Sequence, residues 1–478
     1  MTTSNAPLSD YVQDVVYPDH FHREIMPLWL CSALQALGRR APDLCQPFTW
    51  LELGCGTGVS AVIAAATHPQ GTFIGIDINA AAIVQAQALA QAAGLRNVQF
   101  ICASFEEALN DPAHVLPACE FVVSHGVYSW VSPEIRRVMQ QLVQRLLKPG
   151  GVLYMAYMSQ PGSASMAAAQ KLAQLYASSH ALDTIAQTHQ ALNLLQRTAQ
   201  AGTGYFAEHA RMTSAVDQLA RMDERYVAHE FLNVHWDSLH VADVMADMQS
   251  VDCDFIGSAT LLENVDGASL PVGAQALFQE LLRQGNHCAL LETFKDIARN
   301  QNQRRDLYQR QHPQGNTLNA QTHRQQLLAQ RVCLLPHAPD LQTPLGAHLT
   351  LDTRIGPVEM PMEHVQPLLQ LLQQGPCTYT QLLSIPLYGR QPGLVSQLLQ
   401  LLCWAGWLQF LHVDAPDSDS LQRTTALNQA LAQRPCGQPG QTYAAAVAAG
   451  TAIPVPLVPL TAQQRQRMSW LGMSSTLP

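Results

Sequence analysis

Short apolar runs alternate with longer helical stretches between residues 48 and 157. The apolar runs are short enough for buried strands, and the stretches between them are alanine- or leucine-rich. Strands are predicted at 48–53, 72–77, 98–102, 120–124 and 152–157. Helices are predicted at 59–67, 80–93 and 133–147, with Asn79 capping the second and Gly94 ending it. This alternation predicts βαβ units and a parallel sheet.

The pattern becomes mainly helical after Pro161-Gly162. Residues 164–201 have helical periodicity, 206–250 indicate two more helices, and 254–262 could form a strand. The polar, Gln/Arg-rich segment 297–331 is interpreted as a linker or a solvated helix, with a basic docking patch as the alternative.

Residues 364–413 have the order helix, turn, helix, strand, which is the outline of a winged helix. The first helix is predicted at 364–374, Thr378 can cap the second, and the third ends near Gly406. This last helix has almost no Lys or Arg, and phosphate contacts dominate affinity for DNA. We therefore favour a packing or partner-docking module over a DNA reader.

These patterns predict an α/β protein: a Rossmann-like domain, a mainly helical middle domain and a winged-helix-like C-terminal domain. The expected units are an N-terminal helical cap at 1–47, the α/β domain at 48–162, the middle domain at 163–310, a Gln/Arg-rich linker at 311–345 and the C-terminal domain at 346–478.

Composition excludes several classes of protein. Of the 478 residues, 13% are charged, and 27 basic and 36 acidic side chains give a net charge of -9. This balance argues against electrostatic binding of nucleic acid or anionic lipid by the chain as a whole. Eleven cysteines without a CxxC pair favour free thiols over disulfides or zinc. The start carries no apolar secretory signal, and prolines interrupt the apolar run 443–460. We expect a cytoplasmic protein.

A glycine-rich turn follows the first predicted strand. It reads Gly54-Cys55-Gly56-Thr57-Gly58, two residues after Glu52, and the pattern is GxGxG because position 59 is Val. Glycines permit positive φ and a close approach of the backbone to a ligand. Asp77 ends the next strand, where a carboxylate can accept hydrogen bonds from both hydroxyls of a ribose.

These residues resemble motifs I and II of the class I S-adenosylmethionine-dependent methyltransferases, and Leu147-Lys148-Pro149-Gly150-Gly151 resembles a turn of the same superfamily. The alternative is an unrelated Rossmann-like domain that binds NAD or nothing. The resemblance implies S-adenosyl-L-methionine as cofactor and S-adenosyl-L-homocysteine as product. It implies cofactor contacts at Tyr17, Glu52, Gly54, Cys55, Gly56, Gly58, Asp77, Ile78, Ala103, Ser104, Phe105, Ser124 and His125.

The end of the fourth predicted strand lies where this fold holds the acceptor. It reads SHGVYSWV at 124–131, which differs from the [DNS]PP[YFW] motif of amine methyltransferases acting on bases or glutamine. This segment and YVAHEFLN at 226–233 resemble the methyltransferases that carry a methyltransferase regulatory domain, including the rickettsial outer-membrane-protein lysine methyltransferases. The resemblance implies lysine N-methylation of a protein.

An aromatic pocket would suit a lysine acceptor, since it favours the neutral amine and can hold the methylated cation. The catalytic candidates are His125, Tyr128, Trp130 and Tyr157, with Tyr17 in the same pocket. His125 is either a general base or a structural residue. His229 and Glu230 are interpreted as structural, with a contact between Glu230 and the acceptor lysine left open.

Tyr11, Tyr17 and His20 are expected in a segment that folds over the cofactor. A protein substrate bound by the middle and C-terminal domains is the expected partner. We expect no metal, membrane or nucleic acid, and an oligomer is left open. The alternatives are a small-molecule N- or O-methyltransferase and an inactive cofactor-binding regulator.

Overall fold

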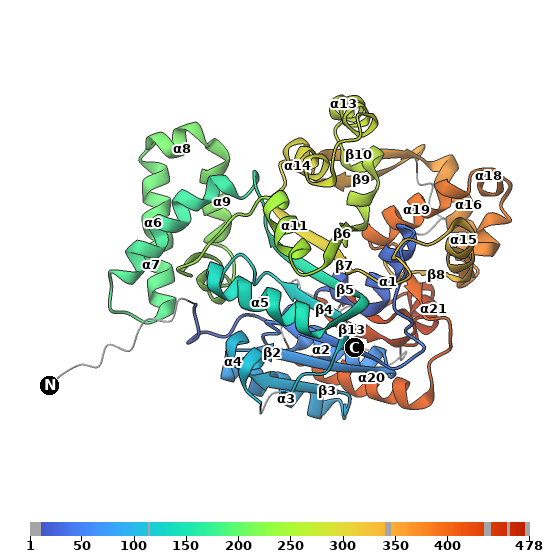
Figure 1. Ribbon diagram of the computed structural model, residues 1–478, viewed down its shortest axis with the longest axis horizontal. Helices are drawn as coiled ribbons and strands as arrows, with labels where there is room; N and C mark the ends of the chain where they lie inside the picture. The colour runs from blue at the N-terminus through green and yellow to red at the C-terminus, as the bar shows by residue number, and fades with distance from the viewer. Residues whose placement is uncertain (1–10, 113–114, 340–345, 435–440, 457–458, 474–478) are drawn as a thin grey trace.

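A seven-stranded sheet forms the centre of the computed structural model, which describes residues 11–112, 115–339, 346–434, 441–456 and 459–473 (Figure 1). The strand order is β3-β2-β1-β4-β5-β7-β6. Strands β1 to β5 are parallel, and β7 is antiparallel to both of its neighbours. The strands are β1 (Phe48–Leu53), β2 (Gly71–Asp77), β3 (Val98–Cys102), β4 (Cys119–His125), β5 (Leu147–Met158), β6 (Cys253–Ser258) and β7 (Gln303–Arg310).

Successive side chains along a strand point to opposite faces of the sheet, and each face has its own hydrophobic core. Trp50 packs in the core shared with helices α1 to α3, whereas Leu51 packs in the core shared with α4, α5 and α11. The helices are α1 (Pro27–Ala36), α2 (Val59–Thr67), α3 (Ala80–Ala92), α4 (Phe105–Asn110) and α5 (Pro133–Leu146). As predicted, Asn79 caps α3 by accepting a hydrogen bond from the Ala82 N–H, and Gly94 follows its end with a φ of 65°.

The chain between β5 and β6 is helical, and its first part projects from the sheet at the left of Figure 1. The stretch predicted at 164–201 is two packed helices, because it turns between Ser179 and Asp183. The prediction of two helices at 206–250 is wrong, since four short ones form there. The elements are η2 (Ala164–Met166), α6 (Ala167–Ser178), α7 (Thr184–Gln200), α8 (Gly204–Glu208), α9 (Ala210–Leu219), α10 (Glu224–Phe231) and α11 (Val241–Gln249).

Strand β7 corrects the prediction of a linker or solvated helix over 297–331 at residues 303–310, whereas the helix at 320–329 has no buried residue. The β7 sequence QRRDLYQR is polar, yet the strand inserts between β5 and β6, and ion pairs satisfy the charge of the buried Arg304. The sheet therefore extends across the predicted domain boundary at residue 162. Between β6 and β7 lie η3 (Leu261–Asn264), α12 (Asp266–Ser269), α13 (Val272–Arg283) and α14 (Cys288–Arg299).

The C-terminal unit, residues 320–473, packs against the α2 side of the sheet. Its elements are α15 (Ala320–Ala329), β8 (Arg331–Leu334), β9 (His348–Thr353), β10 (Gly356–Pro361), α16 (Met362–Leu372), β11 (Cys377–Thr378), α17 (Tyr379–Leu383), α18 (Pro386–Arg390), α19 (Pro392–Trp404), β12 (Leu408–Leu411), α20 (Ser418–Leu431), β13 (Gln441–Ala446), η4 (Val447–Ala449), β14 (Thr451–Pro456) and α21 (Ala462–Trp470). The predicted linker at 311–345 thus contains α15 and β8, and its residues 340–345 lie outside the described part.

Helices α16, α17 and α19 and strands β11 and β12 follow one another in the order of the winged-helix outline. The central strand of their three-stranded sheet is β8, which comes before α16 in the chain. The winged-helix assignment therefore stays a prediction.

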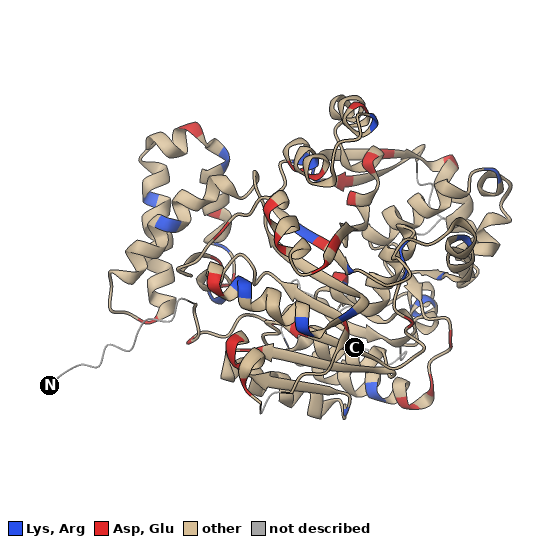
Figure 2. Ribbon diagram, in the orientation of Figure 1, with Lys and Arg blue, Asp and Glu red and all other residues tan. Residues whose placement is uncertain are grey.

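The expected N-terminal cap consists of η1 (Arg23–Ile25) and α1. Residues 11–22 precede it without helix or strand, and residues 1–10 lie outside the described part. Lys and Arg are spread thinly over the elements in Figure 2. None of the described helices is long and apolar enough to cross a membrane.

Candidate active site

The glycine-rich turn between β1 and α2 has the conformation that its sequence predicts. Gly54, Gly56 and Gly58 have φ values of 81°, 52° and 70°, a region that side chains disfavour. A Cβ at Gly54 would lie 2.4 Å from Val127, and one at Gly58 would lie 2.6 Å from both Ala86 and Phe100. A Cβ at Gly56 would meet nothing within 4 Å, so at this residue the turn faces open space.

Asp77 connects this turn to the end of β2. Its carboxylate accepts a hydrogen bond from the Gly56 N–H at 2.7 Å and another from the Asn79 N–H at 2.9 Å. Burial raises the pKa of Asp77, and these backbone hydrogen bonds oppose that rise. Each carboxylate oxygen has a second lone pair, so Asp77 can still accept hydrogen bonds from a ligand.

A cavity of about 500 Å³ opens along the carboxyl ends of β1, β2, β3 and β4, where ligands bind in open α/β sheets. Its wall contains thirteen of the residues predicted from the sequence. They are Tyr17, Glu52, Gly54, Cys55, Gly56, Asp77, Ile78, Ala103, Ser104, Phe105, His125, Trp130 and Tyr157. Gly58 and Ser124 lie behind this wall, where Gly58 shapes the turn and the buried Ser124 hydroxyl donates to the Leu53 carbonyl.

Glu52 offers the cavity a polar atom that is free to bind. The residue is 4% exposed, and its Oε2 atom has no hydrogen-bond partner among the described residues. Burial, reinforced by the neighbouring Asp77, raises the pKa of Glu52 well above its ordinary value. A buried polar group without a partner is costly, so this wall suits a ligand that hydrogen-bonds to it. Together with the open face of Gly56, it fits a nucleoside with polar substituents.

Residues 11–23, which we call the strap and which end at the first residue of η1, form another side of the cavity. Tyr11, Gln13, Tyr17, Pro18, His20 and His22 line it, as the sequence predicts for Tyr11, Tyr17 and His20. The first half of the strap is fixed by α10 and the residues after it. Asn233 accepts a hydrogen bond from the Val12 N–H, and His229 Nε2 lies 2.9 Å from the Val15 carbonyl oxygen.

An aromatic cluster with one carboxylate lies where the strap meets α10. The Tyr17 ring centroid is 5.8 Å from that of Tyr226 and 6.4 Å from that of Trp130, and the Tyr17 hydroxyl donates to Glu230 at 3.3 Å. Burial raises the pKa of Glu230 to about 7. Tyr17, Trp130, Tyr226 and Glu230 all line the cavity, and we call them the aromatic cage.

His125 lies at the end of β4 in a stack of rings. Its ring centroid is 3.5 Å from that of His22, and its Nδ1 is 2.8 Å from the Tyr154 hydroxyl. Burial, with Arg305 and His20 nearby, holds the pKa of His125 well below its ordinary value. His125 is therefore a weak base that is held in one orientation.

Tyr128 is a correction to the sequence analysis. It does not line the cavity; its side chain is fully buried in the core with α5 and α11, and its hydroxyl donates to Asp247 and accepts from Gln140, both at 2.8 Å. The ring packs into this core beyond the end of β4, so it does not face the site. Tyr157 does line the cavity, but its hydroxyl donates to the buried Asp306 at 2.7 Å.

Sequence reasoning missed some of the lining residues. They are His22, Tyr226, His235, Gln303 and Arg305. Gln303 and Arg305 lie on β7, whose polar sequence concealed the strand. Tyr226 begins the segment 226–233 that the sequence analysis quoted, and the spacing of two residues from His20 to His22 was a signal that both side chains face one side.

The fold and the site define a class I methyltransferase, which uses S-adenosylmethionine as methyl donor. Residues 47–241 match the family model of a methyltransferase domain, and residues 223–310 match that of a predicted methyltransferase regulatory domain. The chain therefore contains a methyltransferase domain followed by a methyltransferase regulatory domain, as its sequence motifs predicted.

The chain is similar to two uncharacterized bacterial proteins, one along most of its length and one over about half of it. An uncharacterized protein of Synechocystis is 28% identical over 450 residues, 93% of this chain and 85% of its own length. An uncharacterized protein of Rickettsia prowazekii is 24% identical over 221 residues, 46% of this chain and 86% of its own length. The solved structure of PKMT2 from Rickettsia typhi, also determined with AdoHcy, covers 96% of this chain and 89% of its own at a TM-score of 0.66 and 17–18% identity. The likeness shows that the two chains share a fold over most of their lengths.

Proposed function

We propose that the chain methylates the side-chain amine of lysine in a protein substrate. The family and the methyl donor define the reaction type, and the acceptor is the open question. Its answer rests on one observation: the Glu230 carboxylate lies in the cavity wall beside the rings of Tyr17, Tyr226 and Trp130. The likeness in fold to the rickettsial PKMT2 supports lysine as the acceptor.

An aromatic cage with one carboxylate matches the chemistry of a lysine side chain. Aromatic faces attract an ammonium or methylated ammonium group, and a carboxylate supplies the opposite charge. A long, flexible side chain would reach such a cage while the rest of its protein stays outside.

The reaction requires a neutral amine, although the ordinary pKa of lysine is about 10.4. The bound donor supplies a methyl group on a sulfonium that is already electrophilic. Glu230, with a pKa of about 7, is a better proton acceptor at neutral pH than His125, whose pKa is held well below its ordinary value. We assign to Glu230 the pairing with the ammonium and the acceptance of its proton, and to His125 the orientation of the reactants.

The test uses tritiated methyl donor, the full-length protein and a bacterial lysate. Label should be found in protein and, after acid hydrolysis, in N-methyllysine. Acetylating the lysate beforehand blocks lysine amines and should abolish the label. Asp77→Ala is the negative control, because it removes a donor-site residue.

Other results would contradict the proposal in distinct ways. Label in small molecules would identify a metabolite methyltransferase, and label in acetylated protein would exclude lysine as acceptor. Donor binding by calorimetry without any transfer would identify an inactive cofactor-binding regulator.

A further inference from the structure

Side chains in the second half of the strap alternate between two neighbours. His20 and His22 line the donor cavity. Asp19, Phe21 and Arg23 instead contact the C-terminal unit, more than 370 positions further along the chain. A segment without helix or strand has few backbone hydrogen bonds of its own, so its conformation depends on such contacts.

Three contacts attach the strap to the C-terminal unit. Asp19 forms an ion pair with Arg434 at 3.1 Å, and both side chains are largely buried, 11% and 21% exposed. The Phe21 ring packs edge-on against Tyr443, with centroids 5.3 Å apart. Arg23 donates hydrogen bonds to the carbonyls of Cys403 and Trp404 at the end of α19. The C-terminal end of a helix carries a partial negative charge, so the positive Arg23 guanidinium is favoured there.

Arg434 also connects the strap to the methyltransferase sheet. Its second terminal nitrogen donates to the Gln85 carbonyl on α3 at 3.3 Å. The guanidinium thus joins the strap, α3 and the chain that follows α20. This side chain adds a link between the strap and the sheet that carries Asp77 and the glycine-rich turn, beside the hydrogen bonds that Asn79 and Ser60 make to the strap backbone.

We propose that Arg434, acting through Asp19, is a positioning residue of the donor site. It holds the strap so that His20 and His22 form the cavity wall, and the C-terminal unit is therefore a structural part of the donor site. The inference goes beyond the proposed function and does not depend on the acceptor.

Calorimetry with S-adenosylhomocysteine on the full-length protein tests the proposal. Arg434→Gln should raise Kd about fivefold, the size expected for one largely buried ion pair that acts through a flexible segment. Asp19→Asn should raise it similarly, and the double variant should be no weaker than either single variant, because both remove the same ion pair. Arg434→Lys should restore most of the affinity.

A matched control separates positioning from folding. Arg423 lies on α20 and donates to Ser420 of the same helix, so Arg423→Gln should leave Kd unchanged. Hydrogen exchange of residues 18–23 should be faster in Arg434→Gln, while the melting temperature equals that of Arg423→Gln. The proposal is overturned if Kd is unchanged in Arg434→Gln, or if the losses in Arg434→Gln and Asp19→Asn simply add.

Discussion

At the scale of single residues, Asp77 combines two roles in one carboxylate. It fixes the glycine-rich turn through the Gly56 N–H and faces the donor cavity. Asp77→Ala removes hydrogen bonds to a charged group, so the binding free energy of S-adenosylhomocysteine should weaken by about 1–3 kcal/mol. Calorimetry measures this loss. Unchanged affinity would mean that the donor lies elsewhere.

The role proposed for Glu230 predicts that the rate of methyl transfer depends on pH. Its carboxylate form must be present to accept a proton, and burial raises its pKa to about 7. The rate should therefore be low at pH 6, rise through pH 7 and level off above it. Glu230→Gln should transfer slowly with no step near pH 7, while it binds S-adenosylhomocysteine normally. A step that persists in this variant would assign the titration to another group.

Strand-end residues of the site could be predicted because a local motif places them. Gly54, Gly56 and Asp77 follow from the order strand, turn, helix, strand alone. The aromatic cage could not be derived in this way, since Tyr17 and Glu230 are 213 positions apart and meet through tertiary packing. Tyr128 was misplaced because a position beyond a strand end does not reveal on which side of the sheet its ring packs.

At the scale of elements, two substitutions in the glycine-rich turn should distinguish an effect on donor binding from an effect on folding. Gly56→Ala places a methyl group in open space at a positive φ, so it should cost about 1–2 kcal/mol of folding free energy and block the donor cavity. Gly58→Ala adds collisions with Ala86 and Phe100, so it should destabilise the protein much more. Thermal unfolding and calorimetry on both variants check this order. Equal melting temperatures would contradict it.

Tyr128 connects the segment after β4 to α11 in the core. Tyr128→Phe removes the hydroxyl that bonds to Asp247 and Gln140, which should lower the unfolding free energy by about 1 kcal/mol. The Kd for S-adenosylhomocysteine should not change, because the ring does not line the cavity. A variant with normal stability and weakened donor binding would show instead that Tyr128 contributes to the active site.

Strands differ in how far their own sequence predicts them. Strand β1 was predicted at 48–53 and is observed there, because four of its six residues are buried and apolar and the local pattern suffices. Strand β7 carries Arg304, Asp306 and Gln309 in buried positions. Such residues become compatible with a central strand when distant groups pair with them, and a local pattern does not contain that information.

At the scale of the whole molecule, three parts of the chain meet at one cavity. The sheet supplies the donor-binding turn, the regulatory domain supplies Glu230 and Tyr226, and the strap lies between them. The strap is attached to α10 by its first half and to the C-terminal unit by its second. A disturbance in any of the three parts can therefore reach the reacting groups through side chains already in contact.

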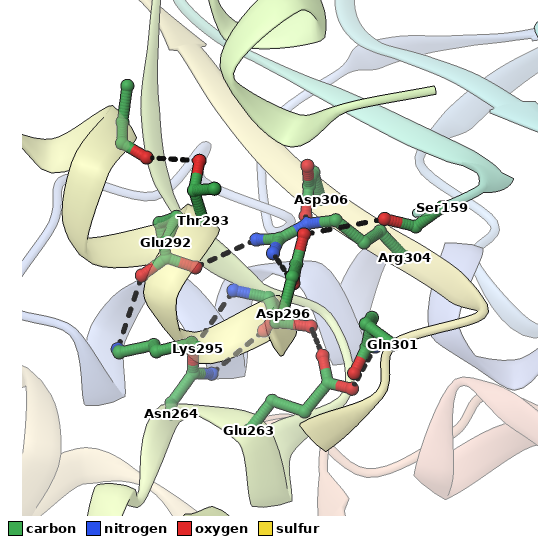
Figure 3. A network of polar contacts seen from close by, with 12 residues as sticks. Ser159, Glu263, Asn264, Glu292, Thr293, Lys295, Asp296, Gln301, Arg304 and Asp306 are labelled. Carbon is green, nitrogen blue, oxygen red and sulfur yellow. Dashed lines mark hydrogen bonds and ion pairs between the residues drawn. The ribbon is translucent and has the colours of Figure 1, made fainter. Parts of the chain in front are cut away.

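An ion-pair network around Arg304 joins strand β7 of the sheet to helix α14 (Figure 3). Arg304 is 3% exposed in its side chain and pairs with Glu292 and Asp296 of α14 and with Asp306. Arg304→Met would leave three buried carboxylates without this cation. At pH 8 the unfolding free energy should fall by about 3–5 kcal/mol.

The same variant should respond to pH in a defined direction. Burial already raises the pKa of Asp296 to about 7 with Arg304 present, and losing the cation should raise it further. A carboxyl whose pKa is higher in the folded than in the unfolded state stabilises the fold at low pH and loses this effect as pH rises. Urea unfolding should therefore show a smaller deficit at pH 5 than at pH 8, whereas Arg304→Lys should retain most of its stability at both. An equal deficit at the two pH values would show that the carboxylates find other cations, and the network would then contribute packing rather than charge.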